Sequence, residues 1–353
     1  MSPVEEKIRA DRGAAPESGG RDYPGALVRD RGEVLRVGLV NNMPDAALRQ
    51  TERQFTEFLT AACPDLPIEV SLYSLPSVPR GLDARHYIDR AYRTTEHLRG
   101  DPPDAIIITG SEPMQQDLRD EPYWHVLTEL VDWAKREQVP AMFSCLAAHA
   151  AVLHLDGIER RPTGAKCVGI FEEVVLTGGA LVEEMAPSLL LPHSRWNEVT
   201  ETALRQAGYE ILTASPQAGV GFFAKPGDAV WLFCQGHPEY DGNSLLREYL
   251  RDIRRYMRHE RATYPTLPQQ YFDEADERQL RAFQKYALAH QDNFAMERFP
   301  ADLQERMTRA AWKASAAPVV ANWLRMARDQ GVLHNLRLPV SDAIHAIMSG
   351  TRH

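Results

Sequence analysis

Short apolar runs alternate with amphipathic stretches through the first half of the chain. Four runs have the composition of strands, and they cover residues 34–41, 68–75, 105–109 and 139–144. Three stretches carry apolar residues at helical spacing, and they cover residues 47–62, 121–136 and 146–155. Runs that are apolar almost throughout indicate strands buried on both faces, as in parallel sheets. The alternation of such strands with helices predicts an α/β fold.

The second half of the chain mixes shorter strands with longer helices. Strands are predicted over residues 171–176, 209–214, 220–224 and 230–234, with turns short enough for some antiparallel pairing. Helices are predicted over residues 243–259, 274–290, 301–328 and 341–348. We therefore expect three parts, which are a mobile N-terminal arm (1–33), an α/β domain (34–260) and a helical C-terminal extension packed on that domain (261–353).

Composition narrows the class of protein. The 353 residues carry a formal net charge of -9, so no basic excess is available to neutralise the phosphates of a nucleic acid. No apolar run approaches the length of a membrane span, and the N-terminal stretch lacks the apolar centre of a signal peptide. The four cysteines show no metal-site or redox spacing, which favours free thiols in a reducing compartment. A cytoplasmic location is expected, with neither nucleic acid nor membrane as a partner.

Cys145 lies where the strand predicted over residues 139–144 meets the next helix. Ligands of open α/β sheets bind at the carboxyl ends of the strands. The first turn of a helix offers free N–H groups, and the helix dipole favours a thiolate there. A single cysteine is more often an ordinary core residue. Position alone therefore makes Cys145 a candidate nucleophile and no more.

A second strand end supplies a candidate base. His237 and Glu239 stand two positions apart, directly after the strand predicted over residues 230–234. An imidazole can take a thiol proton, and a carboxylate can hold that imidazole in the required tautomer. An isolated His-Pro-Glu sequence most often only begins a loop. Its coincidence with a cysteine at another strand end is much rarer and predicts a Cys-His-Glu triad.

A zinc site is the competing interpretation of the same residues. Cys145 and His149 lie four residues apart on a predicted helix, and His237 and Glu239 could complete a ligand set. A thiol beside a base is better explained as a pair for covalent catalysis. No metal site is therefore predicted.

The strand-end Cys145, His237 and Glu239 resemble the triad of the class I glutamine amidotransferase fold. That resemblance implies a three-layer, mostly parallel sheet of the flavodoxin-like type. Further motifs narrow it to the homoserine O-succinyltransferase (homoserine O-acyltransferase) family over residues 35–324. These motifs are NNMP at 41–44, TERQ at 51–54, TG at 109–110, YW at 123–124, PHSR at 192–195, GHPEYD at 236–241, AW at 311–312 and NWL at 322–324.

The family resemblance implies roles for the three triad residues. Cys145 matches the cysteine that carries the acyl group as a thioester. His237 matches the general base, and Glu239 matches the carboxylate that orients it. Backbone N–H groups near Leu146 and in the loop after Gly110 would stabilise the oxyanion.

The resemblance also implies three substrate-binding residues. Lys166 is expected in the loop after the nucleophile helix, Ser194 within the PHSR motif, and Arg251 on the helix predicted over residues 243–259. A guanidinium suits the planar, bidentate pairing that the carboxylate of an amino acid offers. Glu248, one turn before Arg251, would contact the amine.

The implied reaction is a ping-pong transfer from acyl-CoA to the hydroxyl of L-homoserine, as in methionine biosynthesis. Cys145 would attack the acyl carbon and release CoA, and His237 would then deprotonate the homoserine hydroxyl. No cofactor is implied apart from acyl-CoA as substrate, and the family suggests a homodimer.

Three positions depart from the family pattern. Met114 occupies the position that separates succinyl from acetyl donors, His149 replaces a usual glutamine, and Asp45 replaces a usual lysine. Succinyl is the expected acyl group, and acetyl remains open. The alternatives are a divergent paralogue that acylates another hydroxy amino acid, a glutamine amidotransferase-like hydrolase, and a catalytically silent binding protein.

Overall fold

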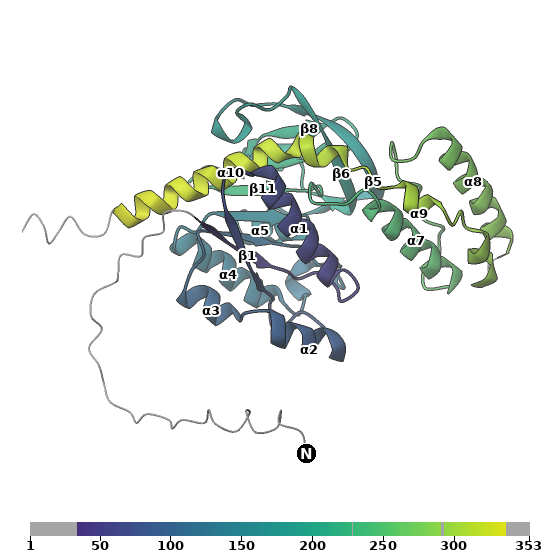
Figure 1. Cartoon of the computed structure of the whole chain (residues 1–353), viewed down its shortest axis with the longest axis horizontal. Coiled ribbons are helices and arrows are strands. Elements are labelled where there is room, and N and C mark those ends of the chain that lie inside the picture. Colours follow the sequence, from purple (N-terminus) through teal and green to yellow (C-terminus); the bar gives the residue numbers. More distant parts are fainter. Residues whose placement is uncertain (1–33, 228, 291–292, 337–353) are drawn as a thin grey trace, which may run out of the picture. The chain divides into compact units, whose positions relative to one another are not determined.

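A computed structural model of the chain describes residues 34–227, 229–290 and 293–336. The predicted N-terminal arm and the helix predicted over residues 341–348 lie outside the described residues. The central element is a seven-stranded sheet (Figure 1). Its strands, in spatial order, are β2 (Ile68–Tyr73), β1 (Leu35–Val40), β3 (Ala105–Ile108), β4 (Ala141–Ser144), β11 (Trp231–Cys234), β10 (Phe222–Lys225) and β7 (Glu210–Ile211).

The first five strands of this sheet run parallel, β10 pairs antiparallel with β11, and β7 pairs antiparallel with β10. Successive residues of β3 enter opposite core clusters, because Ile106 and Ile108 pack on one face and Ala105 and Ile107 on the other. That is the burial expected of a strand whose residues are all apolar. The predicted α/β fold with a mostly parallel sheet is therefore confirmed.

Helices cover both faces of the sheet. Apolar residues of α3 (Thr95–Gly100), α4 (Trp124–Arg136) and α5 (Leu146–Asp156) belong to one core cluster. Those of α1 (Leu48–Ala62) and α10 (Ala311–Leu336) belong to the other. Two further helices, α2 (Leu82–Ala91) and α6 (Glu201–Gln206), and the short η1 (Leu118–Asp120) and η2 (Ala180–Val182) complete this part. No helix within the described residues is both long and apolar enough to cross a membrane.

A second, antiparallel sheet joins β6 (Ser188–Glu198), β5 (Arg161–Val175), β8 (Thr213–Ser215) and β9 (Gly219–Val220) in that order. Two predictions are wrong here. The stretches 209–214 and 220–224 are not single strands, because the chain changes sheets at Leu212 and Gly221. Lys166 does not lie in a loop, because it is part of β5; Ser194 is part of the neighbouring strand β6.

The C-terminal third of the chain forms its own small core and then returns to the main one. Apolar residues of α7 (Ser244–Met257), α8 (Glu274–Ala289) and α9 (Leu303–Arg306) share a third cluster, beside the short η3 (Asn293–Arg298). Trp312 and Trp323, both on α10, then anchor the chain. The Trp312 indole donates to the Tyr240 carbonyl at 2.9 Å, and the Trp323 indole donates to the Val230 carbonyl at 3.1 Å.

Candidate active site

Cys145 is the junction between β4 and α5. Its φ of 51° and ψ of −111° lie in a region that L-residues rarely adopt, and such strain is typical of functional turns. Its N–H donates to the carbonyl of Cys234 on the neighbouring parallel strand β11 at 2.7 Å. The turn therefore leaves the thiol at the carboxyl end of the sheet, as predicted, at the start of α5.

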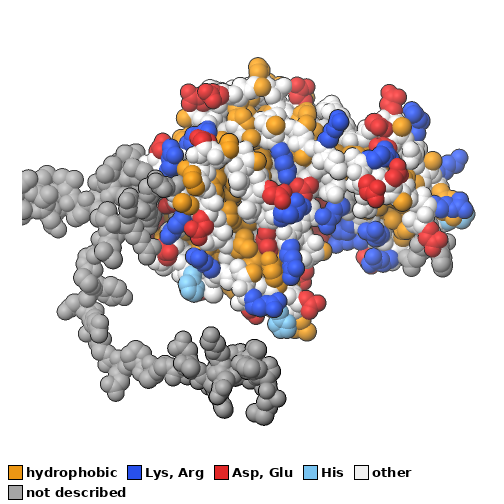
Figure 2. Space-filling view, in the orientation of Figure 1, with side chains coloured by type: hydrophobic (Ala, Val, Ile, Leu, Met, Phe, Trp, Pro, Cys, Tyr) orange, Lys and Arg blue, Asp and Glu red, His pale blue; other side chains and the backbone are white. Residues whose placement is uncertain are grey.

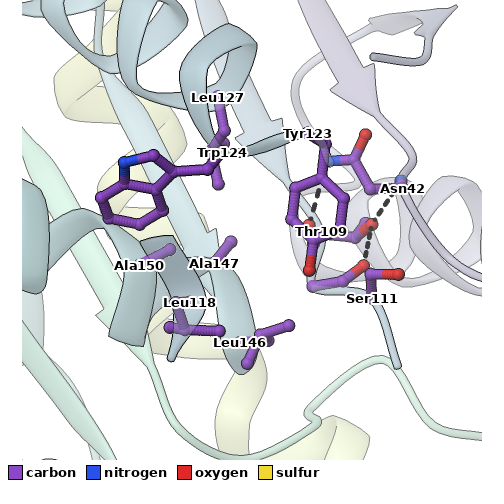
Figure 3. A pocket seen from close by; sticks show the side chains of 11 residues that line it. Asn42, Thr109, Ser111, Leu118, Tyr123, Trp124, Leu127, Leu146, Ala147 and Ala150 are labelled. Atoms are coloured by element: carbon purple, nitrogen blue, oxygen red, sulfur yellow. Dashed lines mark hydrogen bonds between the residues drawn. The ribbon is translucent and has the colours of Figure 1, made fainter. Parts of the chain in front are cut away.

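The loop after β3 closely approaches the first turn of α5. A Cβ atom added at Gly110 would lie 2.9 Å from the Leu146 backbone nitrogen and 2.8 Å from its Cβ, so only glycine fits without displacement. Gly110, Ser111 and Leu146 line a cavity of about 10 Å³, enough for about one water (Figure 3). Two backbone segments with free N–H groups thus meet beside Cys145, which is the arrangement that an oxyanion requires.

His237 and Glu239 follow β11, the strand paired with β4. The Nδ1 atom of His237 lies 2.9 Å from Oε1 of Glu239, which leaves Nε2 for the thiol. The ring stacks on Tyr240 with centroids 4.2 Å apart, and the His237 N–H donates to the Pro192 carbonyl on β6 at 2.8 Å. Both sheets therefore hold the base in place.

The groups around His237 favour the protonated form of its imidazole. Burial lowers the pKa of this imidazole, but charge and hydrogen-bond interactions with Cys145 and Glu239 outweigh burial and raise it well above the usual value of 6.5. An imidazolium paired with a thiolate is the reactive state of cysteine nucleophiles. The predicted triad residues therefore meet with the electrostatics that covalent catalysis needs.

The stacked Tyr240 connects the triad to Glu248 on α7. Its hydroxyl donates to Oε1 of Glu248 at 2.5 Å. The Ser194 hydroxyl donates to the other oxygen, and the Lys166 ammonium lies 3.4 Å from that same oxygen. Burial raises the pKa of Glu248, but Lys166, Arg251 and these hydroxyls outweigh it and lower the pKa overall. Two of the predicted substrate-binding residues, from β5 and β6, thus converge on one ionised carboxylate.

Arg251, the third predicted substrate-binding residue, lies on the same helix as Glu248. Its Nε and Nη2 atoms lie 3.3 and 3.2 Å from Oδ1 of Asp252. Asp252 also pairs with Lys166 at 3.1 Å and with Arg261 at 3.3 Å. Figure 2 shows Lys and Arg side chains gathered in the region that α7 occupies in Figure 1.

This group of ionised side chains, which we call the α7 cluster, carries an excess of one positive charge. Its three cations are Lys166, Arg251 and Arg261, and its two carboxylates are Glu248 and Asp252. One further carboxylate can therefore be accommodated without leaving a net negative charge. Arg251 keeps 44% of its side chain exposed, so its guanidinium is accessible to such a ligand.

Tyr240 and Asp252 are site residues that sequence reasoning did not assign. Tyr240 directly follows Glu239 in the GHPEYD motif, and this position next to the triad could have marked it as a site residue. Nothing in the sequence shows that Asp252 holds Lys166, because that contact joins β5 to α7. His149 holds the strand end, with Nε2 2.9 Å from Oε1 of Gln235. No cluster of metal-ligating side chains occurs among the described residues.

A buried polar network, also not foreseen, supports the segment of β6 that contacts His237. Glu173 and His193 are fully buried, with His193 Nε2 2.8 Å from Oε1 of Glu173. The Arg195 Nε–H donates to His193 Nδ1 at 3.3 Å, and the Thr213 hydroxyl donates to Glu173. Gly221 leaves room for this carboxylate, because a Cβ there would overlap its oxygens. The network fixes the backbone on either side of His193, which includes Pro192 and Ser194.

Replacing Glu173 with glutamine should change how stability depends on pH. Burial raises the pKa of Glu173 from 4.5 to about 8, against the opposing effects of Thr213 and Arg195. The folded protein then binds more protons here than the unfolded chain does, so this residue's stabilisation is complete below pH 4.5 and is lost as pH rises towards 8. Glutamine does not titrate. The stability of the wild type relative to Glu173→Gln should therefore fall across that window, by at most about 1.4 kcal/mol per pH unit.

Urea unfolding of both proteins between pH 4.5 and 8.5 measures this difference. His193 contacts Glu173 directly at 2.8 Å, so the difference between the two curves reports the titration of the Glu173–His193 pair. A difference that stays constant across the window would show that Glu173 is already ionised in the folded protein.

Comparison with known proteins identifies the family of the chain. The profile of the homoserine O-succinyltransferase family matches residues 26–332. The chain is 46% identical over 299 residues to a homoserine O-succinyltransferase of Methylorubrum extorquens, covering 85% of this chain and 89% of that protein. It is 44% identical to the one from Rhodopseudomonas palustris (82% and 87% covered) and 42% identical to the one from Bradyrhizobium japonicum (84% and 90% covered).

Among solved structures, a glutamine amidotransferase from Methylobacillus flagellatus aligns with a TM-score of 0.46 at 15% identity, over 83% of this chain and 94% of that one. The family assignment rests on the sequence matches, which are far stronger and span most of both proteins. The chain therefore belongs to the homoserine O-succinyltransferase family, a family of acyltransferases.

Proposed function

We propose that the protein transfers the succinyl group of succinyl-CoA to the hydroxyl of L-homoserine through a thioester on Cys145. The relatives are named for this reaction, which supplies the substrate class. The observation that carries the proposal is the direct connection between the triad and the α7 cluster through Tyr240, which stacks on His237 and bonds Glu248.

The α7 cluster has the charges that an amino-acid acceptor needs. A homoserine ammonium would bind Glu248, and its carboxylate would bind Arg251, which is partly exposed and can pair in bidentate fashion. The excess positive charge of the cluster offsets that carboxylate. Because Tyr240 links Glu248 to His237, an acceptor held here would place its side-chain hydroxyl towards the base.

The proposed chemistry has two steps. The Cys145 thiolate attacks the acyl carbon, the thioester bond to CoA breaks, and CoA leaves as a thiol with a proton from His237. His237 then removes the proton of the homoserine hydroxyl, whose oxygen attacks the Cys145 thioester and releases the thiolate. The Leu146 N–H and the loop beside Gly110 stabilise the oxyanion in both steps. Apart from acyl-CoA the reaction as written requires no cofactor.

Intact-mass measurement tests the proposal. The protein is incubated with succinyl-CoA alone, and the mass should rise by one succinyl group. Addition of L-homoserine should discharge the adduct and yield O-succinylhomoserine, whereas L-serine and water should discharge it far more slowly. Acetyl-CoA is run in parallel as the second donor.

The outcomes separate this proposal from its alternatives. Discharge by another hydroxy amino acid but not by homoserine would indicate a divergent acyltransferase. Absence of an adduct with either donor, together with release of ammonia from glutamine, would indicate an amidotransferase-like hydrolase. Absence of every reaction would indicate a binding protein.

The methionine pathway, the cytoplasmic location, the homodimer and the domain boundaries stay predictions. A role in the methionine pathway requires that homoserine is the acceptor.

A further inference from the structure

Arg160 stands between the end of α5 and the start of β5. Its side chain is half-buried. Nη2 donates to the Gln115 carbonyl at 3.2 Å and to the Gln116 carbonyl at 2.9 Å. The guanidinium therefore lies against the loop that follows β3, which is the loop that reaches Cys145 through Gly110.

That loop is held from two sides. Oε1 of Glu121 accepts the N–H groups of Met114 at 2.6 Å and of Gln115 at 2.8 Å. Glu121 thus satisfies donors of the same short segment whose carbonyls bind Arg160. Met114 is 61% exposed and uncharged, so it offers no ion pair to an acyl group. Arg160 is a cation held against this loop, whose own ionisable residues Glu112 and Asp117 are acidic.

Arg160 has no carboxylate partner within the described residues. No Asp or Glu there forms an ion pair with it, and its Nε and Nη1 atoms make no hydrogen bond to that part of the chain. The adjacent Arg161 differs in exposure and in pairing. Its side chain is 66% exposed, and its Nε lies 3.1 Å from Oε1 of Glu198. Glu121 and Asp117 act on the Arg160 guanidinium only at longer range, without a direct ion pair. Its remaining donors are therefore available to a ligand that carries a carboxylate.

Several charged or ionisable groups surround Arg160. Burial lowers the pKa of its guanidinium, and the nearby Tyr123, Glu121, Asp117 and Cys145 oppose that effect. Cys145 is thus close enough for the two charges to interact.

We propose that Arg160 binds the distal carboxylate of a dicarboxylic acyl group while Cys145 carries it, and so selects succinyl over acetyl. The inference rests on the proposed function. Three carbon–carbon bonds put the distal carboxylate of a succinyl thioester about 4 Å beyond the reacting carbon. A guanidinium can then hold that carboxylate through two parallel hydrogen bonds. An acetyl group has no atom that reaches Arg160.

Variants at Arg160 test this with both donors. Arg160→Gln should lower kcat/KM for succinyl-CoA by about 10- to 100-fold, because a charge-assisted pair is lost. It should leave kcat/KM for acetyl-CoA within about twofold, since that donor makes no use of the guanidinium. Arg160→Lys should recover part of the succinyl-CoA activity, because it restores the charge without the bidentate geometry.

Arg161→Gln is the matched control, and it should change neither donor. An equal loss with both donors in Arg160→Gln would assign Arg160 to loop support or to CoA, and would overturn the proposal. Unchanged values with both donors would overturn it as well, as would a wild-type enzyme that prefers acetyl-CoA. If the wild-type protein acylates homoserine with neither donor, the proposed function itself fails, before any variant is compared.

Discussion

Cys145→Ser should lower the rate of acyl transfer by about 10⁴-fold or more while the protein remains folded. A serine hydroxyl is a far weaker acid than a thiol, so the anionic nucleophile is lost although the shape of the side chain is nearly kept. The side chain of Cys145 lies at the surface end of β4, outside the three core clusters. Its replacement should therefore leave the urea midpoint nearly unchanged.

Steady-state kinetics and intact mass measure both parts of this result. The matched control is Cys167→Ser, on β5, whose thiol is less reactive because burial raises its pKa. That variant should still form the adduct and turn over. An adduct that persists in Cys145→Ser, or that is lost only in Cys167→Ser, would remove Cys145 from the mechanism.

Glu239→Gln should lower kcat by about 10³-fold through its effect on His237. The amide is neutral, so it cannot stabilise the imidazolium that Glu239 pairs with at 2.9 Å. If its NH₂ group faces the ring, the tautomer that accepts the thiol proton is lost as well. Glu239 is one of the groups that raise the pKa of His237, so that pKa should fall in the variant.

The pH profile of kcat/KM distinguishes this effect from simple loss of structure. The limb that reports His237 should move to lower pH in Glu239→Gln, in addition to the drop in rate. Asp132→Asn is a matched control, because Asp132 holds the surface residue His154 at 2.8 Å in a similar pair. That control should leave both the rate and the profile unchanged. A Glu239→Gln enzyme with the wild-type rate and profile would show that Glu239 does not act on the base.

The strands that precede the triad residues could be predicted from the sequence because all their residues except Ser144 are apolar. The side chains of β4 (AMFS) and β11 (WLFC) are buried on both faces of the sheet. Cys145 directly follows β4, and His237 follows shortly after β11. Parallel strands bring such ends to one edge of a sheet. The order of elements was therefore enough to place Cys145 near His237.

The substrate side could not be placed in the same way. Strand β6 reads SLLLPHSRWNE, in which Pro192 and a run of polar residues obscure the alternation that identifies a strand. Strand β5 begins with polar residues whose hydrogen bonds go to β6, a long-range pairing with no local signal. Only the family resemblance singled out Lys166 and Ser194, and it did not show that they lie on adjacent strands.

The changes of sheet at Leu212 and Gly221 were missed for a related reason. An apolar stretch that passes from one sheet to another looks the same in sequence as one continuous strand. The buried Glu173 was missed because its carboxylate is stabilised by Thr213 and His193, which are distant in the chain. Tertiary hydrogen bonds of this kind leave no pattern in local hydrophobicity.

The return of α10 to the main core sets the order in which the protein can be assembled during translation. Residues of β1 leave the ribosome first, and those of α10, with Trp323 at its centre, leave last, although both belong to one apolar cluster. Helix α1 can cover part of that face early, but the part that α10 covers stays exposed until residues 311–336 have been made. The growing polypeptide therefore exposes an apolar surface for much of its synthesis. Its yield of folded protein in the cell should depend on holdase chaperones, even if the finished protein is stable.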